Sequence, residues 1–146
     1  MLTVWQAGHK TIERMIEKIT PENIGFRVLP EMNSVGFLLR HIAESEIGIS
    51  KTAFNGPGAE FQRKTVGPNI TDTGEHIQVD EIKEMFANAG QAVEAAIANI
   101  KNEEWDEIVE LRMGTYPRSA YVSWLASHSA YHAGQITLAL KYGKSW

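Results

Sequence analysis

A long segment near the end of the chain is almost free of charge. Between Arg118 and Lys141 the only side chains able to carry charge are two histidines. The apolar residues of this segment recur at helical spacing, which predicts one helix from about residue 117 to residue 141. A helix that is apolar around most of its circumference is buried on more than one side. The segment therefore predicts a helical bundle that covers it from several directions.

Three earlier segments have the spacing of amphipathic helices. They cover residues 2–19, 33–53 and 80–101, and the short polar side chains Asn33-Ser34 and Asp80 are suited to cap the second and the third. Four such helices predict a single all-α domain over residues 1–146, folded as an antiparallel four-helix bundle. Since four helices seldom hide one member fully, the uncharged last helix also predicts a homodimer.

Two connections break the helical pattern. Residues 55–78 contain four glycines and two prolines without periodicity, which predicts a long loop between the second and third helices. Loops of this length are often lids or binding loops. Farther on, apolar Val109, Leu111 and Met113 alternate with charged residues, which predicts a short extended piece that ends at Gly114.

Composition excludes several classes of partner and ligand. The formal net charge is −4 and no run of basic residues is present, which argues against a nucleic-acid or anionic-membrane surface. Cysteine is absent, so disulfides and sulfur-ligated metals are excluded. The first ten residues do not resemble a secretory signal, and no apolar stretch reaches the roughly 18 residues of a membrane span. A cytoplasmic protein is the expectation.

His128 and His132 are four residues apart in the uncharged helix. Side chains at this spacing lie one turn apart on the same face, which suits two imidazoles that bind one metal ion. A catalytic metal centre of the zinc type usually takes three protein ligands, so a third ligand is needed. The candidates are His9, His41 and His76. His9 lies near a helix terminus that can fray, and His76 lies in the loop. His41 is favoured because it lies in the middle of a predicted helix, and rigid elements position metal ligands best.

Two segments resemble the DinB-like (YfiT-type) metal-binding four-helix bundles. They are LLRHIAESE at residues 38–46 and HSAYHAGQI at residues 128–136, and the order of helices and loop is also similar. The resemblance implies that His41, His128 and His132 bind one divalent metal ion, with water at the open positions. It also implies a homodimer.

A branch of that superfamily consists of S-transferases that use bacillithiol, mycothiol or glutathione. The resemblance therefore implies a metal-dependent S-transferase whose partners are a small thiol and an electrophilic small molecule. A metal held by imidazoles lowers the pKa of bound water or thiol, and imidazole suits zinc, nickel, iron or copper. Two alternatives stay open: a metal-binding, stress-related protein without turnover, and a metal-dependent hydrolase in which Glu44 is the proton acceptor.

Other polar residues near these motifs are expected to have hydrogen-bonding or packing roles rather than metal-binding ones. Glu44 and Gln135 are candidate hydrogen-bond partners for the metal-binding histidines, because such ligands normally donate their second nitrogen to an acceptor. Apart from this role, the glutamates of the second helix are expected on a solvated face. We expect His9 to pack at the end of the bundle, His76 to lie on the surface, and Gly134 to allow close helix packing.

Overall fold

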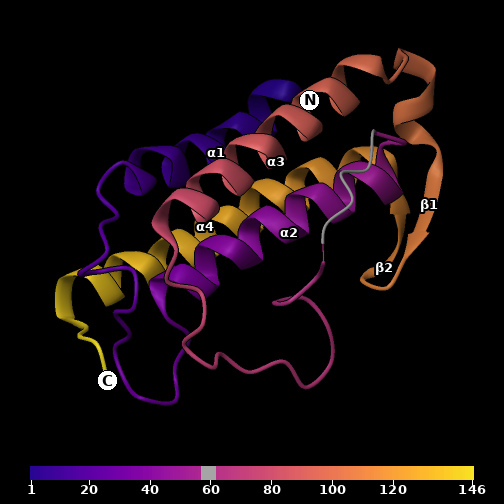
Figure 1. The fold of residues 1–146 in the computed structure, drawn as a ribbon. Helices are drawn as coiled ribbons and strands as arrows, with labels where there is room; N and C mark the ends of the chain where they lie inside the picture. Colours follow the sequence, from indigo (N-terminus) through magenta and orange to yellow (C-terminus); the bar gives the residue numbers. More distant parts are fainter. Residues whose placement is uncertain (57–61) are drawn as a thin grey trace.

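The computed structural model describes residues 1–56 and 62–146. These residues form four long helices that lie alongside one another, together with one 3-10 helix and one two-stranded sheet (Figure 1). The mostly helical fold predicted from the sequence is confirmed, and the sheet is an addition to it. The elements in chain order are α1 (Leu2–Ile16), α2 (Val35–Ala53), α3 (Val79–Asn99), η1 (Asn102–Asp106), β1 (Ile108–Leu111), β2 (Gly114–Pro117) and α4 (Arg118–Tyr142).

The helix ends follow local chemistry. The predicted cap of α2 is confirmed: the Ser34 hydroxyl accepts a hydrogen bond from the Phe37 amide at 3.3 Å. The predicted cap of α3 is wrong, because that helix begins at Val79 and Asp80 lies in its first turn. A carboxylate is favoured there by the positive end of the helix dipole. Helix α1 ends three residues before the predicted limit because the chain tightens into turns with i to i+3 hydrogen bonds, the last from Ile19.

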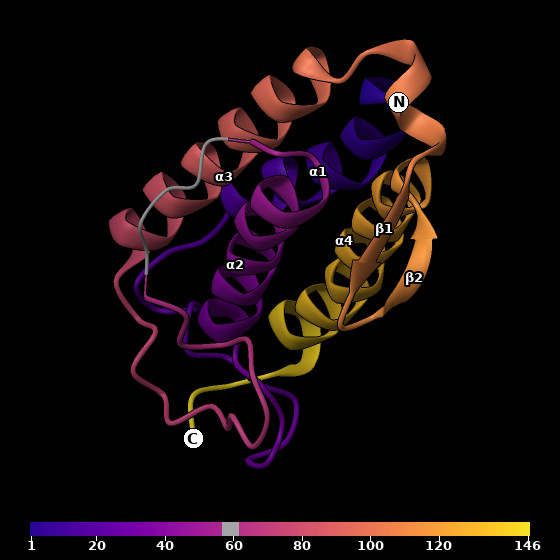
Figure 2. The same cartoon turned by 90° about the vertical axis from the view of Figure 1, so that its right-hand side faces the viewer.

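A β-hairpin precedes α4 and lies against it (Figure 2). The extended piece predicted around Val109 is confirmed as β1, whereas the returning strand β2 was not expected. Gly114 permits the reversal because its φ of +136° lies in a region that other residues rarely adopt. The buried Tyr121 of α4 places its hydroxyl 3.1 Å from the Val109 carbonyl oxygen and 2.7 Å from that of Gly114, which fixes the hairpin to the helix.

The most enclosed helix is α2 rather than α4. Fifteen of the nineteen α2 residues are buried, including Arg40, Glu44 and Glu46, because α3, α4 and residues 62–65 all contact this helix. The two glutamates were expected on a solvated face, and that expectation is wrong. Helix α4 is covered by its own chain on one face, while its Tyr131 and Leu138 side chains are 65% and 53% exposed. Among the described residues, no helix combines the length and apolar character needed to cross a membrane.

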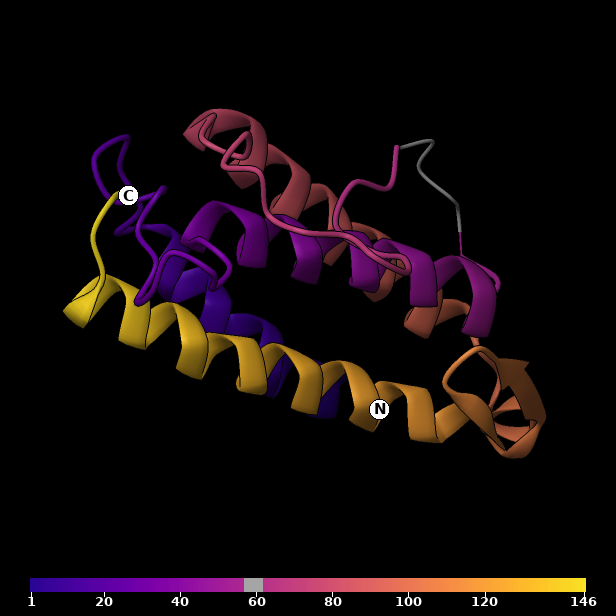
Figure 3. The same cartoon turned by 90° about the horizontal axis from the view of Figure 1, so that it is seen from below.

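Residues 62–78, the described part of the chain that leads into α3, lie along α2 and are fixed to it at several points (Figure 3). Asp72 accepts hydrogen bonds from the Ser34 amide at 2.6 Å and from Arg27 at 3.1 Å. The His76 carbonyl oxygen lies so close to Gly36 that a Cβ there would overlap it. His76 itself is 6% exposed, with its ring 5.7 Å from that of Phe37. The prediction of a surface histidine is therefore wrong.

Candidate metal centre

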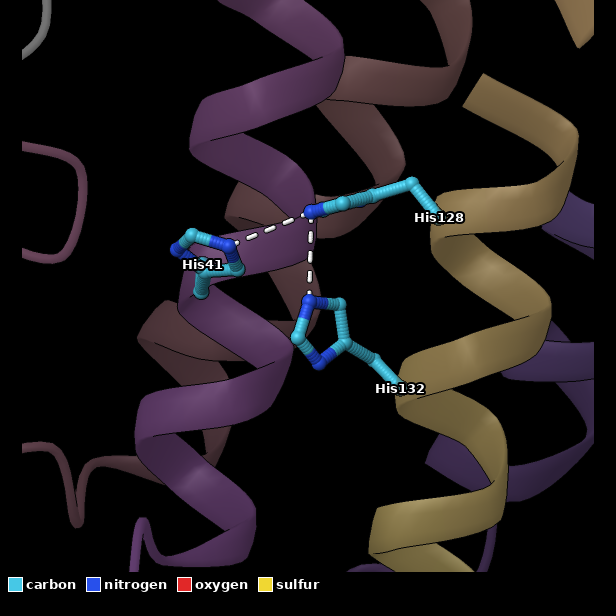
Figure 4. Close-up of side chains that lie close together, drawn as sticks. All are labelled: His41, His128 and His132. Atoms are coloured by element: carbon cyan, nitrogen blue, oxygen red, sulfur yellow. Dashed lines mark hydrogen bonds between the residues drawn. The ribbon is translucent and has the colours of Figure 1, made fainter. Parts of the chain in front are cut away.

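Three histidines from two helices converge between α2 and α4 (Figure 4). His128 Nε2 lies 3.2 Å from His41 Nε2 and 3.2 Å from His132 Nε2. One ligand atom from each residue lies within 4.8 Å of the others. His9, His41 and His76 were the candidates for the third ligand beside His128 and His132. The structure places His41 next to this pair.

Local packing orients these imidazoles. His128 and His132 are one turn apart on α4, and both face α2. The Trp124 ring stacks on His128 with centroids 4.5 Å apart, and the Tyr131 ring meets His132 edge-on at 5.0 Å. All three histidines are partly buried. Their side chains are thus held by neighbouring rings and remain partly exposed.

The outer nitrogens of two histidines have acceptors. His41 Nδ1 donates to the Thr65 carbonyl oxygen at 2.9 Å, and His132 Nδ1 donates to Gln135 Oε1 at 2.6 Å. The second contact confirms Gln135 as the predicted partner of a site histidine. In the neutral form of each ring these acceptors place the hydrogen on Nδ1, so that Nε2 presents a lone pair toward His128. The far nitrogen of His128, Nδ1, is buried without a partner among the described residues.

Burial and neighbouring charge keep the two imidazoles of α4 uncharged. Burial, followed by the neighbouring His132 and His41, lowers the pKa of His128 to about 3. Burial also lowers the pKa of His132, against the opposing effect of its Gln135 hydrogen bond. The two imidazoles of α4 are therefore neutral near pH 7 and able to donate electron pairs.

The donor set fits a divalent cation. A single hydrogen on His128 Nε2 can satisfy the lone pair of one neighbour, His41 or His132. One metal ion would accept electron pairs from all three nitrogens at once. Three imidazoles with no carboxylate joining the described cluster form the ligand set of an open zinc-type centre. The residues present can thus hold one metal ion.

Glu44 lies beside this cluster but does not join it. Its carboxylate is 1% exposed and accepts hydrogen bonds from Arg40 Nε, from the Lys64 and Thr65 amides and from the Thr65 hydroxyl. Its link to His41 is indirect, through Thr65. The sequence did not predict Thr65 as a partner of His41. The atom that accepts from His41 is a backbone carbonyl oxygen, which every residue type has.

His9 belongs to a separate buried cluster. Its Nδ1 lies 3.0 Å from both carboxylate oxygens of Glu46, and its ring stacks on Phe86 with centroids 4.4 Å apart. It is 8% exposed and packs among α1, α2 and α3 rather than lining the three-histidine cluster. Gly134 makes no close contact: no described atom lies within 4 Å of the position a Cβ would take. The close packing predicted at Gly134 is not found among the residues that the structure describes.

The fold and site define a helical domain that carries three converging histidines on two facing helices. The sequence profile of the DinB superfamily matches residues 5–136. The chain therefore belongs to the DinB superfamily. No match is found among curated proteins.

Solved structures share this fold at low sequence identity. One is the mycothiol-dependent maleylpyruvate isomerase, seen unaltered and as a point mutant, with TM-scores of 0.71 and 0.72 and 18% identity over 92% of this chain. The chain spans 58% of the length of that protein. Another is a conserved protein from Enterococcus faecalis, with a TM-score of 0.72 and 12% identity, which covers 97% of this chain and 93% of its own.

Proposed function

We propose that the chain is a divalent-metal-dependent S-transferase that activates a small thiol for reaction with an electrophile. The observation that carries the proposal is the convergence of three Nε2 atoms, from His41, His128 and His132, without a further ligand among the described residues. Such a set leaves coordination positions for molecules from outside. A thiol of the bacillithiol, mycothiol or glutathione type is the proposed partner, and the fold shared with a mycothiol-dependent enzyme supports this choice.

The metal would supply a lowered pKa for a bound thiol, so that a thiolate forms near neutral pH. The residues of the chain hold the site ready for it. Thr65 and Gln135 fix the rings of His41 and His132, and this hydrogen bonding raises their strength as ligands. In the transfer the thiol loses its proton to solvent and its sulfur forms a bond to an electrophilic carbon. The bond between that carbon and its leaving group breaks, and the leaving group departs to solvent with the electron pair. Zinc, nickel and iron all suit an imidazole site.

A hollow near the cluster offers room for the organic part of a substrate. Its volume is about 240 Å³, and its lining includes Leu38 and Gln135, which lie three residues from His41 and His132. The remaining lining residues are Val28, Glu31, Met32, Asn33, Leu138 and Ala139. This mixture of apolar, amide and carboxylate groups suits an amphipathic small molecule.

The test is to purify the chain without a histidine tag, measure its metal content and assay it with small thiols and generic electrophiles. We expect about one divalent ion per chain and a rate of thiol consumption that disappears on chelation and returns with metal. Bound metal without turnover of thiol, ester or amide substrates would identify the alternative, a metal-binding protein without catalysis. Turnover of esters or amides alone would indicate the hydrolase. Absence of bound metal contradicts all three.

We also propose that the chain forms a homodimer through α4. The support is the apolar outer face of this helix, where the Tyr131, Leu138 and Tyr142 side chains are 65%, 53% and 64% exposed. Contiguous exposed apolar surface of this kind marks interaction sites. We expect sedimentation velocity to give a dimer, and replacement of Leu138 with aspartate to give a monomer. A monomeric unaltered chain at micromolar concentration contradicts the proposal.

The cytoplasmic location of the protein stays a prediction.

A further inference from the structure

We propose that Glu44 is a positioning residue that acts through Thr65 on His41, so that metal binding and attachment of residues 62–65 to α2 stabilise each other. The proposal rests on the metal centre of the proposed function. It gives Glu44 a role different from that of a proton acceptor.

The first step is the way Glu44 holds the segment. The Lys64 amide lies 3.0 Å from Oε1, while the Thr65 amide and hydroxyl lie 2.9 Å and 2.8 Å from Oε2. Glu44 and Thr65 are 1% and 4% exposed, so these bonds are shielded from water. Hydrogen bonds to a buried carboxylate are stronger than those between neutral groups. The carboxylate therefore fixes the backbone at Thr65.

The second step is the contact between Thr65 and the histidine. The same residue whose amide and hydroxyl bind Glu44 turns its carbonyl oxygen toward His41 Nδ1, at 2.9 Å. A carbonyl oxygen can only accept, so the neutral His41 ring must carry its hydrogen on Nδ1. Nε2 is then free of hydrogen and faces His128. Displacement of the backbone at Thr65 would release both the orientation and the tautomer of this ligand.

Arg40 completes the arrangement. This buried guanidinium donates from Nε to Glu44 at 2.8 Å and from a terminal nitrogen to the Gln62 carbonyl oxygen at 3.3 Å. It thus balances the carboxylate and binds the segment directly. Its remaining ion pair, with Glu81, involves a side chain that is 61% exposed. Glu81 contacts Arg40 but makes no described contact with Lys64 or Thr65, which makes it a suitable control.

The coupling between the two events is reciprocal. A metal ion on Nε2 immobilises the His41 ring and so strengthens the requirement for an acceptor at Nδ1. Attachment of residues 62–65 raises the metal affinity by some coupling free energy. By thermodynamic linkage, metal binding then stabilises the attachment of these residues by the same free energy. The free oxygen electron pairs that a proton acceptor needs are instead committed to four donors.

The variants that test this inference are Glu44→Gln and Thr65→Val, with Glu81→Gln as the control. A glutamine at position 44 would place an NH2 group against backbone amides that also donate. A valine at position 65 keeps the shape and the carbonyl group but removes the hydroxyl. Zinc affinity would be measured by competition with a chromophoric chelator. Hydrogen exchange of the Lys64 and Thr65 amides would be followed with and without zinc.

We expect Glu44→Gln to weaken zinc binding by about 10- to 100-fold, the range found for partners of metal ligands. Thr65→Val should weaken it less, and Glu81→Gln should leave it unchanged. Zinc should slow exchange of the two amides in the unaltered chain. Unchanged affinity in both Glu44→Gln and Thr65→Val, or amide exchange unaffected by zinc, overturns the inference but not the metal centre. Loss of rate with full zinc affinity would restore the proton-acceptor role, and an unaltered chain that binds no zinc overturns both.

Discussion

Replacement of His132 with alanine is expected to lower the affinity for a divalent metal by at least about 100-fold. Structural zinc sites with four ligands bind with about 10–16 kcal/mol, or roughly 3 kcal/mol per ligand, and about 1.4 kcal/mol corresponds to a factor of ten. His132 supplies one of three converging nitrogens, so its loss leaves two ligands. It also leaves Gln135 Oε1 without its 2.6 Å partner.

Chelator competition measures this effect, and elemental analysis of the purified variant gives an independent value. The control is His76→Gln, which removes a buried imidazole that lies outside the cluster. The control should keep the metal, although it should lose some stability. Equal metal affinity in His132→Ala and in the unaltered chain would remove the basis of the proposed site and of the catalytic proposal.

The parts of the site that sequence predicts are those encoded in side-chain type and helical spacing. The four-residue interval between His128 and His132 is sufficient to place both on one face of α4. Gln135 is likewise within one turn of His132, where an acceptor is expected. His41 comes from a helix 87 residues away, so local spacing cannot select it over His9 and His76. Its position in the middle of a predicted helix favours it, and the resemblance to DinB-like proteins implies the same choice.

Other features depend on partners that are distant in sequence or that belong to the backbone. Arg40, Glu44 and Glu46 have the local pattern of a solvated helix face, yet the chain covers all three. Their burial requires acceptors and donors from residues 62–65 and from α1, which no periodicity in α2 reveals. Buried charged groups of this kind are retained only where such partners exist. The sequence pattern therefore identifies the helix correctly and its exposure incorrectly.

Glu46 illustrates how much stability these hidden partners contribute. Its carboxylate is fully buried and lies 3.0 Å from the indole nitrogen of Trp5 and from His9 Nδ1. The His9 ring is enclosed between Trp5 and Phe86, and Gly90 leaves space for it, since a Cβ there would lie 2.7 Å from Nε2. The cluster thus joins α1, α2 and α3 at a point away from the three-histidine site.

Replacement of Glu46 with alanine is expected to lower the free energy of unfolding by about 2–6 kcal/mol, the cost of leaving two buried donors unsatisfied at about 1–3 kcal/mol each. Two enclosed donors, on Trp5 and His9, would lose their acceptor, and a cavity would remain. Urea unfolding of the metal-free protein measures this loss. Glu94→Ala, at an exposed position of α3, is the control and should change stability by less than about 0.5 kcal/mol. A loss below about 1 kcal/mol for Glu46→Ala would show that water replaces the carboxylate and that the cluster does not hold the three helices together.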